Sequence, residues 1–301
     1  MINALEANRL GKCYGNYWAL RNCTLHIPQG CIAGLIGLNG AGKTTLLHLA
    51  VGLLKPTEGT IDVLGISSRN IATLLPHIGF VSQERSLYRH FTVGETLMLG
   101  KKLNPRWDEA RAHASVERLK LPLQQAVGKL SGGQQAQMAL VMALAKRPEI
   151  LFLDEPFAHV DPLAKQELIK ILMDAAVEQP LTAVISSHSV SDLENICDYV
   201  IILTPSQVKL AERMEQMREQ HKRLIGPREG FEAMAQSHTI IQASHVGRQS
   251  SALVRTTLPI TDPAWQIEDA SLEDIVLAYL TSRLPCSVYK SILIHNFTQS
   301  N

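Results

Sequence analysis

The sequence is poor in aromatic residues and has no excess of charge of either sign. Phe, Trp and Tyr make up 5% of the 301 residues, and 29 Lys and Arg stand against 28 Asp and Glu, for a net charge of +1. A protein whose main task is to bind nucleic acid is usually basic, or offers aromatic side chains on which bases stack. The composition therefore argues against nucleic acid as a partner.

The chain also lacks paired cysteines and long hydrophobic runs. Its five cysteines are odd in number and include no C-x-x-C pair, which is typical of reduced thiols rather than of a disulfide framework or a zinc site. The first residues, MINALEANRLGK, contain no apolar signal core, and no run of 18 apolar residues occurs. We therefore expect a cytoplasmic protein that does not cross a membrane. Hydrophobic residues make up 46%, enough for a sizeable core.

Residues 31–50, CIAGLIGLNGAGKTTLLHLA, have the layout of a phosphate-binding loop. An apolar stretch of strand length precedes the pattern G-x-x-x-x-G-K-T, and an apolar helix start follows it. Glycines let backbone N–H groups surround a phosphate, Lys43 supplies positive charge, and the Thr44 hydroxyl is a ligand suited to Mg²⁺. The alternative is a glycine-rich turn that happens to precede a lysine. The predicted nucleotide-binding residues here are Gly37, Leu38, Asn39, Gly40, Ala41, Gly42, Lys43, Thr44 and Thr45.

Apolar strands alternate with helices through much of the remaining first 210 residues. A predicted strand at 150–153 ends in Asp154-Glu155, a helix is expected at 162–177, and a strand at 181–185 ends in Ser186-Ser187-His188. This order predicts a parallel α/β sheet, in which ligands bind beyond the carboxyl ends of the strands. Between residues 92 and 147 the spacing becomes helical, which indicates an inserted helical subdomain.

Two further regions flank this α/β part. Short strands are expected at 2–10 and 23–27, on either side of a turn at Tyr14-Gly15-Asn16. Beyond about residue 210 we expect a charged helix at 211–224, a break at Gly226-Pro227, two strands at 239–242 and 252–256, and a helix at 272–284. Ser271 and Asp274 have the spacing of a capping box at the start of that last helix. We thus expect a first domain, 1–210, with its helical subdomain at about 86–148, and an accessory region, 211–301.

Five motifs in order resemble those of the ATP-binding subunits of ABC transporters, over about residues 2–210. Residues 130–134, LSGGQ, match the signature of that family letter for letter. They lie between the phosphate loop and the strand ending in Asp154-Glu155, with Gln83 before them and His188 after them. The resemblance implies a P-loop NTPase core with a mainly parallel sheet, an antiparallel β subdomain and an inserted helical subdomain, plus a small C-terminal α+β appendage. It also implies ATP and Mg²⁺ as cofactors and ATP hydrolysis as the reaction.

The resemblance implies roles for single residues. Glu155 would polarise the attacking water, His188 would hydrogen-bond the γ-phosphate, and Gln83 would sense Mg²⁺ and the water. Each has an ordinary alternative, since a loop acid, a strand-end histidine and a surface glutamine are common. The implied catalytic residues are Lys43, Gln83, Glu155 and His188, and the implied metal site consists of Thr44, Gln83 and Asp154.

Other implied roles concern the base and a second chain. Tyr14 stands where the family keeps an aromatic residue that stacks on adenine, with Tyr17 and Trp18 as nearby rivals. Asp161 resembles the aspartate of a loop that crosses a dimer interface. The signature residues would cap the γ-phosphate held by another subunit, so a second ATP-binding subunit, identical or paralogous, is expected. The signature residues assigned to nucleotide binding are Ser131, Gly132, Gly133 and Gln134.

The chain departs from the family pattern at two places. Gln135-Ala136-Gln137 follows the signature where relatives usually carry basic residues, and the interface loop reads Ala158-His159-Val160-Asp161 where relatives usually have Ser and Leu at its first and third positions. The second change puts in doubt a hydrogen bond from that Ser across a dimer. Neither change affects Lys43 or Glu155.

The resemblance further implies a motor subunit of a transporter whose membrane-spanning permease is a separate polypeptide. The permease would dock in a groove near residues 83–107, which would place the chain peripherally on the inner face of the cell membrane. Residues 103–108 and 270–275 resemble segments of bacterial export-type, ABC-2-like ATPases, which favours an exporter. The alternatives are a non-transport ABC ATPase acting on ribosomes or DNA, and a regulatory module that closes on ATP.

Overall fold

A computed structural model describes residues 2–281, which form two compact units. The first unit extends to Ala211, and the second begins at Glu212. The last three residues of the helix expected at 272–284, and Cys286, lie outside the described residues.

A four-stranded antiparallel sheet opens the first unit, with the order β2-β1-β4-β5. Its strands are β1 (Asn3–Tyr14), β2 (Tyr17–Pro28), β4 (Glu58–Val63) and β5 (Ile66–Ser67). The first two strands are longer than the expected 2–10 and 23–27, because the hairpin pairs as far as Tyr14 and Tyr17. Several register shifts along β1 break the apolar alternation that would have revealed this length. The prediction of a turn between them is confirmed.

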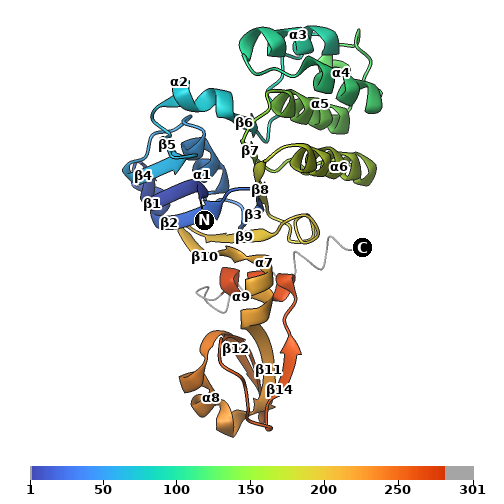
Figure 1. Ribbon diagram of the computed structural model, residues 1–301. Coiled ribbons are helices and arrows are strands. Elements are labelled where there is room, and N and C mark those ends of the chain that lie inside the picture. Colours follow the sequence, from blue (N-terminus) through green and yellow to red (C-terminus); the bar gives the residue numbers. More distant parts are fainter. Residues whose placement is uncertain (1, 282–301) are drawn as a thin grey trace. The chain divides into compact units, whose positions relative to one another are not determined.

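The second sheet of this unit has six strands in the order β10-β9-β3-β8-β7-β6 (Figure 1). They are β3 (Ile32–Ile36), β6 (Ile78–Val81), β7 (Ile150–Leu153), β8 (Thr182–Ser187), β9 (Tyr199–Thr204) and β10 (Gln207–Arg213). All the pairings from β9 through β3, β8 and β7 to β6 are parallel. The predicted mainly parallel sheet is confirmed, and β3, β7 and β8 are buried along their whole length, as parallel strands covered on both faces should be.

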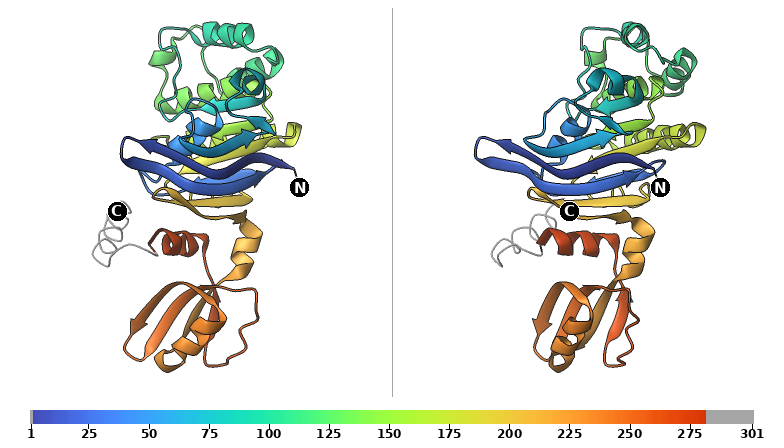
Figure 2. Two further views of the ribbon diagram at one scale, coloured as in Figure 1. Left: turned by 90° about the vertical axis from the view of Figure 1, so that its left-hand side faces the viewer. Right: turned by 60° about the vertical axis from the view of Figure 1, so that its left-hand side comes forward.

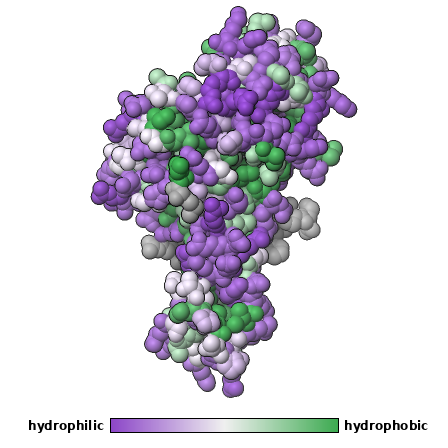
Figure 3. Space-filling view, in the orientation of Figure 1, coloured by the Kyte–Doolittle hydropathy of each residue, from purple (hydrophilic) through white to green (hydrophobic). Residues whose placement is uncertain are grey.

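The helices of the first unit are α1 (Lys43–Ala50), α2 (Ile71–Leu74), α3 (Val93–Leu103), α4 (Glu109–Arg118), α5 (Gly132–Ala145) and α6 (Pro162–Glu178). Helices α3, α4 and α5 lie together and form the inserted helical subdomain (Figures 1 and 2). It has its own small core, which includes Val93, Leu97, Val116 and Met138. Thr92 and Glu95 form a capping box that starts α3. Its visible surface is mostly hydrophilic (Figure 3).

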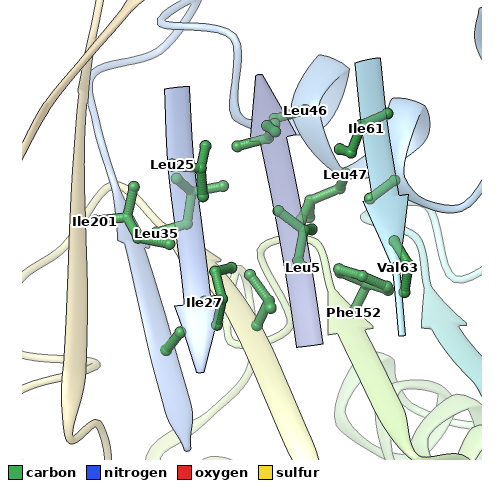
Figure 4. Packing of buried hydrophobic residues seen from close by; sticks show 14 of the residues in the cluster. Leu5, Leu25, Ile27, Leu35, Leu46, Leu47, Ile61, Val63, Phe152 and Ile201 are labelled. Carbon is green, nitrogen blue, oxygen red and sulfur yellow. The ribbon is translucent and has the colours of Figure 1, made fainter. Parts of the chain in front are cut away.

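The main core lies between the two sheets and α1. Apolar side chains of the antiparallel sheet, such as Leu5, Leu25 and Ile61, face Leu35 and Phe152 of the parallel sheet (Figure 4). Leu46 and Leu47 of α1 complete the same cluster. Buried contacts with several strands therefore fix the position of α1. Because α1 directly follows the phosphate-binding loop, these contacts also fix the end of the loop.

The second unit is built on a four-stranded antiparallel sheet with the order β12-β13-β11-β14. Its elements are α7 (Met214–Gln220), β11 (His221–Pro227), α8 (Phe231–Ser237), β12 (Thr239–Val246), β13 (Gln249–Arg255), β14 (Gln266–Asp269) and α9 (Leu272–Thr281). This is the predicted α+β appendage, and the fold class is confirmed. At the start of α9, Ser271 Oγ accepts from the Asp274 N–H at 3.1 Å, which is the first of the two hydrogen bonds of a capping box, and its hydroxyl donates to the Asp274 carboxylate at 2.7 Å.

The prediction of a charged helix at 211–224 is wrong for half of its length. Only residues 214–220 are helical, and residues from His221 to Pro227 form β11, a strand paired on both sides, with β13 and β14. The charged residues of the strand, Lys222 and Arg223, are half-buried, while His221 and Leu224 are fully buried. Residues 221–227 form a strand because they pair with β13 and β14, more than twenty residues away in the sequence. A local sequence pattern does not reveal such pairing.

No helix among residues 2–281 is long and apolar enough to cross a membrane. This agrees with the absence of a long hydrophobic run.

Phe152 provides a test of the main core. Its side chain is fully buried between the two sheets, so Phe152→Ala should lower the free energy of unfolding of the first unit by about 3–5 kcal/mol. Urea titration followed by circular dichroism measures this. Leu163→Ala, at a position 76% exposed on α6, should change stability by less than about 0.5 kcal/mol. Equal effects of the two substitutions would contradict this core assignment.

Candidate nucleotide site

The phosphate-binding loop connects β3 to α1 and depends on two glycines. Gly42, the N-cap of α1, has a φ of 107°, and a Cβ there would lie 2.5 Å from the Ala19 carbonyl oxygen. A Cβ on Gly37 would lie 2.4 Å from the Leu203 carbonyl oxygen. Neither position accepts a side chain, so the loop can wrap tightly and direct the unpaired N–H groups of the first turn of α1 inward. Such a helix start favours an anion.

Lys43 reaches from this loop to the end of β7. Its Nζ donates to the Gly37 carbonyl at 2.8 Å and lies 3.2 Å from Oε1 of Glu155. Both side chains are less than a tenth exposed. A buried pair of charges is costly unless hydrogen bonds complete its coordination, and here the backbone carbonyl of the loop and a histidine do so. The predicted catalytic lysine and carboxylate are therefore neighbours.

His188 holds the second oxygen of the same carboxylate. Its Nδ1 lies 2.8 Å from Oε2 of Glu155, and its own side chain is 54% exposed. Glu155 also has a left-handed backbone conformation, with a φ of 48°, which costs energy in a residue other than glycine and persists only where surrounding contacts impose it. Glu155 thus has a fixed orientation, with one oxygen toward Lys43 and the other toward a solvent-facing histidine.

Ser186 is a site residue that the sequence analysis missed. At the end of β8, its fully buried hydroxyl accepts from the Glu155 backbone N–H at 2.9 Å and donates to Oδ1 of Asp154 at 2.7 Å. One serine therefore positions both carboxylate residues. The sequence did offer a signal, because Ser186 is a polar residue directly after the apolar residues of β8. That strand is adjacent to β7, which Asp154 and Glu155 follow.

A cavity of about 650 Å³ opens over the phosphate-binding loop. It brings together predicted residues from five separate regions of the chain. Its predicted lining residues are Tyr14, Asn39, Gly40, Ala41, Gly42, Lys43, Thr44, Thr45, Gln83, Glu155 and His188, joined by Tyr17, Ala19, Ala158 and His159. Gly37 and Leu38 lie beneath it, where their carbonyls accept from Lys43, and Asp154 is buried behind it. The size suits a ligand as large as a nucleotide.

The predicted metal ligands fit Mg²⁺ by their chemistry. Thr44 and Gln83 line the cavity and Asp154 is adjacent, so hydroxyl, amide and carboxylate oxygens are available, as a hard cation prefers. Among residues 2–281 no cluster of three or more His, Cys, Asp or Glu could hold a metal without help. Mg²⁺ in a nucleotide site typically takes one or two protein ligands together with phosphates and water, which is what this donor set allows.

Two of the three rival aromatic residues line the cavity. Tyr14 is 46% exposed and Tyr17 is 57% exposed, and the Tyr17 hydroxyl donates to the Gly40 carbonyl at 3.2 Å. Trp18 instead stacks with Arg21 and packs against Gly11. The Tyr17 hydroxyl is engaged by the phosphate loop, and Lys12 Nζ lies 5.3 Å from the centre of the Tyr14 ring. Stacking of a base on Tyr14 stays a prediction of the resemblance.

The signature residues lie outside this cavity, at the start of α5. Ser131 and Gln134 form a capping box, in which the Ser131 hydroxyl accepts from the Gln134 N–H at 3.2 Å and the Gln134 side chain accepts from the Ser131 N–H at 3.0 Å. Ser131 and Gly132 are exposed, whereas Gly133 is buried against Ala164. Asp161 caps α6 beside it. The exposed end of α5 is free to meet another molecule.

Comparisons with known proteins agree with this geometry. Residues 20–158 match the family described as "ABC transporter". The chain is 33% identical over 216 residues to the sulfate/thiosulfate import ATP-binding protein CysA of Acinetobacter baylyi, covering 68% of this chain and 61% of the relative. It is 32% identical over 206 residues to the bacitracin transport ATP-binding protein BcrA of Bacillus licheniformis, covering 67% of each chain. The chain thus spans about 61% of the length of the CysA relative.

Solved structures show the same fold. One described as the ATP-binding subunit of an ABC transporter superposes with a TM-score of 0.65 at 26% identity, over 72% of this chain and 92% of its own. A dimeric bacterial ABC transporter cassette, MJ0796, gives 0.64 at 26% identity, over 70% and 98%. The same cassette is also known in a post-hydrolysis state with ADP and phosphate. The chain belongs to the ABC transporter family, and its first unit has the P-loop NTPase fold of the ATP-binding cassettes of that family.

The two tyrosines allow a test of base recognition. Stacking on an aromatic ring contributes about 1–3 kcal/mol per base, so Tyr14→Ala should weaken ATP binding by about 5- to 150-fold. Tyr17→Ala should have a smaller effect, because its ring does not hold the base. Equilibrium binding of a fluorescent ATP analogue measures both. A larger loss for Tyr17→Ala would reverse the assignment.

Ser186 allows a test of carboxylate positioning. Ser186→Ala leaves two buried polar partners without their hydrogen bonds and should lower stability by about 1–3 kcal/mol. It should also reduce ATP turnover, since Glu155 loses its backbone anchor. Thermal unfolding and steady-state ATPase assays measure the two effects. Ser191→Ala, an exposed serine nearby, serves as the control, and equal turnover in the two variants would contradict the positioning role.

Proposed function

We propose that this chain binds and hydrolyses ATP to drive a separate membrane-spanning permease. The observation that carries the proposal is the arrangement of Lys43, Glu155 and His188 around one cavity above a phosphate-binding loop. Membership of the ABC transporter family supports the coupling to transport.

Different residues of the site have different roles in phosphoryl transfer. The N–H groups of the loop and Lys43 bind the β- and γ-phosphates, and Tyr14 stacks on the base. Glu155 accepts a hydrogen bond from the attacking water, which orients it in line with the γ-phosphate, and His188 steadies Glu155 and the phosphate. Thr44, Gln83 and Asp154 would hold Mg²⁺, which would neutralise charge that develops on the phosphates. An incoming phosphate offers Lys43 a new anionic partner, which frees Oε1 of Glu155 for the water.

The active unit contains two ATP-binding subunits in this proposal. The exposed signature residues Ser131 and Gly132 lie outside the chain's own cavity, where they are free to reach a nucleotide held by a second copy or a paralogue. Ser131 offers a hydroxyl and the start of α5 a partial positive charge. Asp161, at the start of α6, borders the same surface. The solved cassette that is described as dimeric supports this arrangement.

The permease partner would dock on the helical subdomain, near residues 83–107. Large apolar side chains are exposed there, with Tyr88 at 64%, Met98 at 57% and Leu103 at 69%, and Tyr88 stacks on Phe91. Apolar side chains gathered on a surface are typical of a protein interface. Docking there would hold the chain at the inner face of the cell membrane.

We favour export as the direction of transport. Residues 103–108 and 270–275 resemble export-type ATPases, and this resemblance carries the proposal. The sulfate/thiosulfate relatives are import proteins by name, and the bacitracin relative is named for transport alone. ATP-driven transport of a radiolabelled substrate into or out of inside-out vesicles containing this chain and its permease separates them: accumulation indicates export, and failure to accumulate with ATP-dependent release indicates import.

The hydrolysis itself is tested with Glu155→Gln. The wild-type chain should hydrolyse ATP with a rate per chain that rises with protein concentration, because two chains complete each site. The variant should lose most of this turnover, at least about a hundredfold, and should accumulate an ATP-bound dimer in size-exclusion chromatography with Mg²⁺. The amide keeps the size of the side chain but is a poor base.

Two results would contradict the proposal. Unchanged turnover in the variant would remove Glu155 from catalysis. Failure of the wild-type chain to bind a multi-span membrane protein, with every candidate permease present, would remove the transporter role.

A further inference from the structure

Arg85 connects the signature at the start of α5, proposed to bind the second chain's nucleotide, with the turn that lines the chain's own nucleotide cavity. Its Nη1 donates to the carbonyl of Gly132 at 2.8 Å, and its Nη2 donates to the carbonyl of Ala158 at 2.7 Å. Gly132 belongs to the signature at the start of α5. Ala158 lies in the turn after Glu155 and lines the nucleotide cavity.

The backbone around Arg85 directs its side chain inward. Arg85 follows Gln83 in the turn after β6, where its N–H bonds to the Ser82 carbonyl at 2.9 Å. Its φ is 49°, a left-handed conformation that is unfavourable for arginine and that surrounding contacts must hold. Its stem lies in a small apolar crevice lined by Ala136, Leu140 and Phe157. This burial lowers the pKa of the guanidinium, yet arginine keeps its charge at neutral pH.

The guanidinium is well suited to this double contact. Its N–H donors project in one rigid plane, so one side chain can hold two carbonyls at a set separation. Hydrogen bonds from a charged donor are also stronger than neutral ones. The contact is close, since a Cβ on Gly132 would lie 3.6 Å from Nη1.

We propose that Arg85 is a positioning residue that couples the nucleotide cavity of its own chain to the signature surface that the chain presents to a second one. Gln83, two residues earlier, lines the cavity, so the turn carrying Arg85 responds to what the cavity holds. Arg85 transmits this change to Gly132 and to the loop between Glu155 and Asp161. The inference rests on the proposed function, because the signature surface matters only if two chains form the active unit.

The coupling is tested with Arg85→Ala and Arg85→Lys in the full chain. Lysine keeps the charge and the stem but cannot hold both carbonyls, so both variants should act in the same direction. In the Glu155→Gln background, each should weaken the ATP-dependent dimer by at least about tenfold, as expected for loss of charge-assisted hydrogen bonds. Analytical ultracentrifugation measures dimerisation. Arg69→Ala, an exposed arginine outside the cavity, should dimerise as its parent does.

If Arg85 only stabilised the fold, its variants would lose ATP binding together with dimerisation. Binding of ATP with Mg²⁺ to the single chain, measured at low protein concentration, should change less than about twofold in Arg85→Lys. With Glu155 intact, kcat should fall while KM stays the same. Arg85→Lys behaving like the wild-type chain, or losing ATP binding and dimerisation to the same extent, would overturn the proposal.

A second measurement does not depend on hydrolysis or on dimers. In the single chain, Arg85→Ala should accelerate amide hydrogen exchange in both residues 131–135 and 156–160, because one side chain holds both segments. Unchanged exchange in either segment would overturn the coupling, whether or not the chain hydrolyses ATP. No ATP turnover by the wild-type chain, by contrast, would refute the proposed function.

Discussion

The site depends on the close approach of two buried charges, Lys43 and Glu155, at the carboxyl edge of the parallel sheet. The lysine follows β3 and the carboxylate follows β7, and these strands are separated in the sheet by β8. The end of β8 therefore lies between them. Ser186 there accepts from the Glu155 backbone N–H, and His188 hydrogen-bonds the Glu155 carboxylate. The order of three strands brings four functional side chains together, although more than a hundred residues separate the first from the others.

The pairing of Lys43 with Glu155 contributes more to ligand binding than to the stability of the fold. A buried ion pair seldom adds much net stability, because removing both charges from water offsets most of their attraction. The buried core between the two sheets supports the site instead, through the apolar contacts of α1 with β1, β2 and β4 (Figure 4). In the proposed reaction Lys43 exchanges the Glu155 carboxylate for a phosphate. The site keeps its geometry during this exchange only if the protein around it is rigid.

The helical subdomain has a different relation to the site. Its core is separate from the main core, so the signature at the start of α5 is not positioned by the packing that holds the phosphate loop. The start of α5 is connected to the rest of the first unit by the packing of Gly133 against Ala164 beside Asp161 and by the two hydrogen bonds of Arg85. Helix α5 also lies against α6 and β6, and its Ala136 and Leu140 share a small apolar crevice with Phe157, so apolar packing joins the two parts as well.

The sequence by itself determined the parallel sheet, the phosphate loop and the residues at the strand ends, because each follows from a local pattern: apolar runs, glycine spacing and polar strand termini. It also indicated the hydrogen bond between Ser271 and Asp274 at the start of α9, which depends on neighbours a few residues away. Tyr14 came from the family resemblance and stays a prediction. Only the tertiary structure decided that residues 221–227 form a strand, that Ser186 anchors Asp154 and Glu155, and that Arg85 bridges Gly132 and Ala158. These features depend on contacts between segments from about twenty to more than seventy residues apart, and no local pattern of residues contains the pairing that creates them.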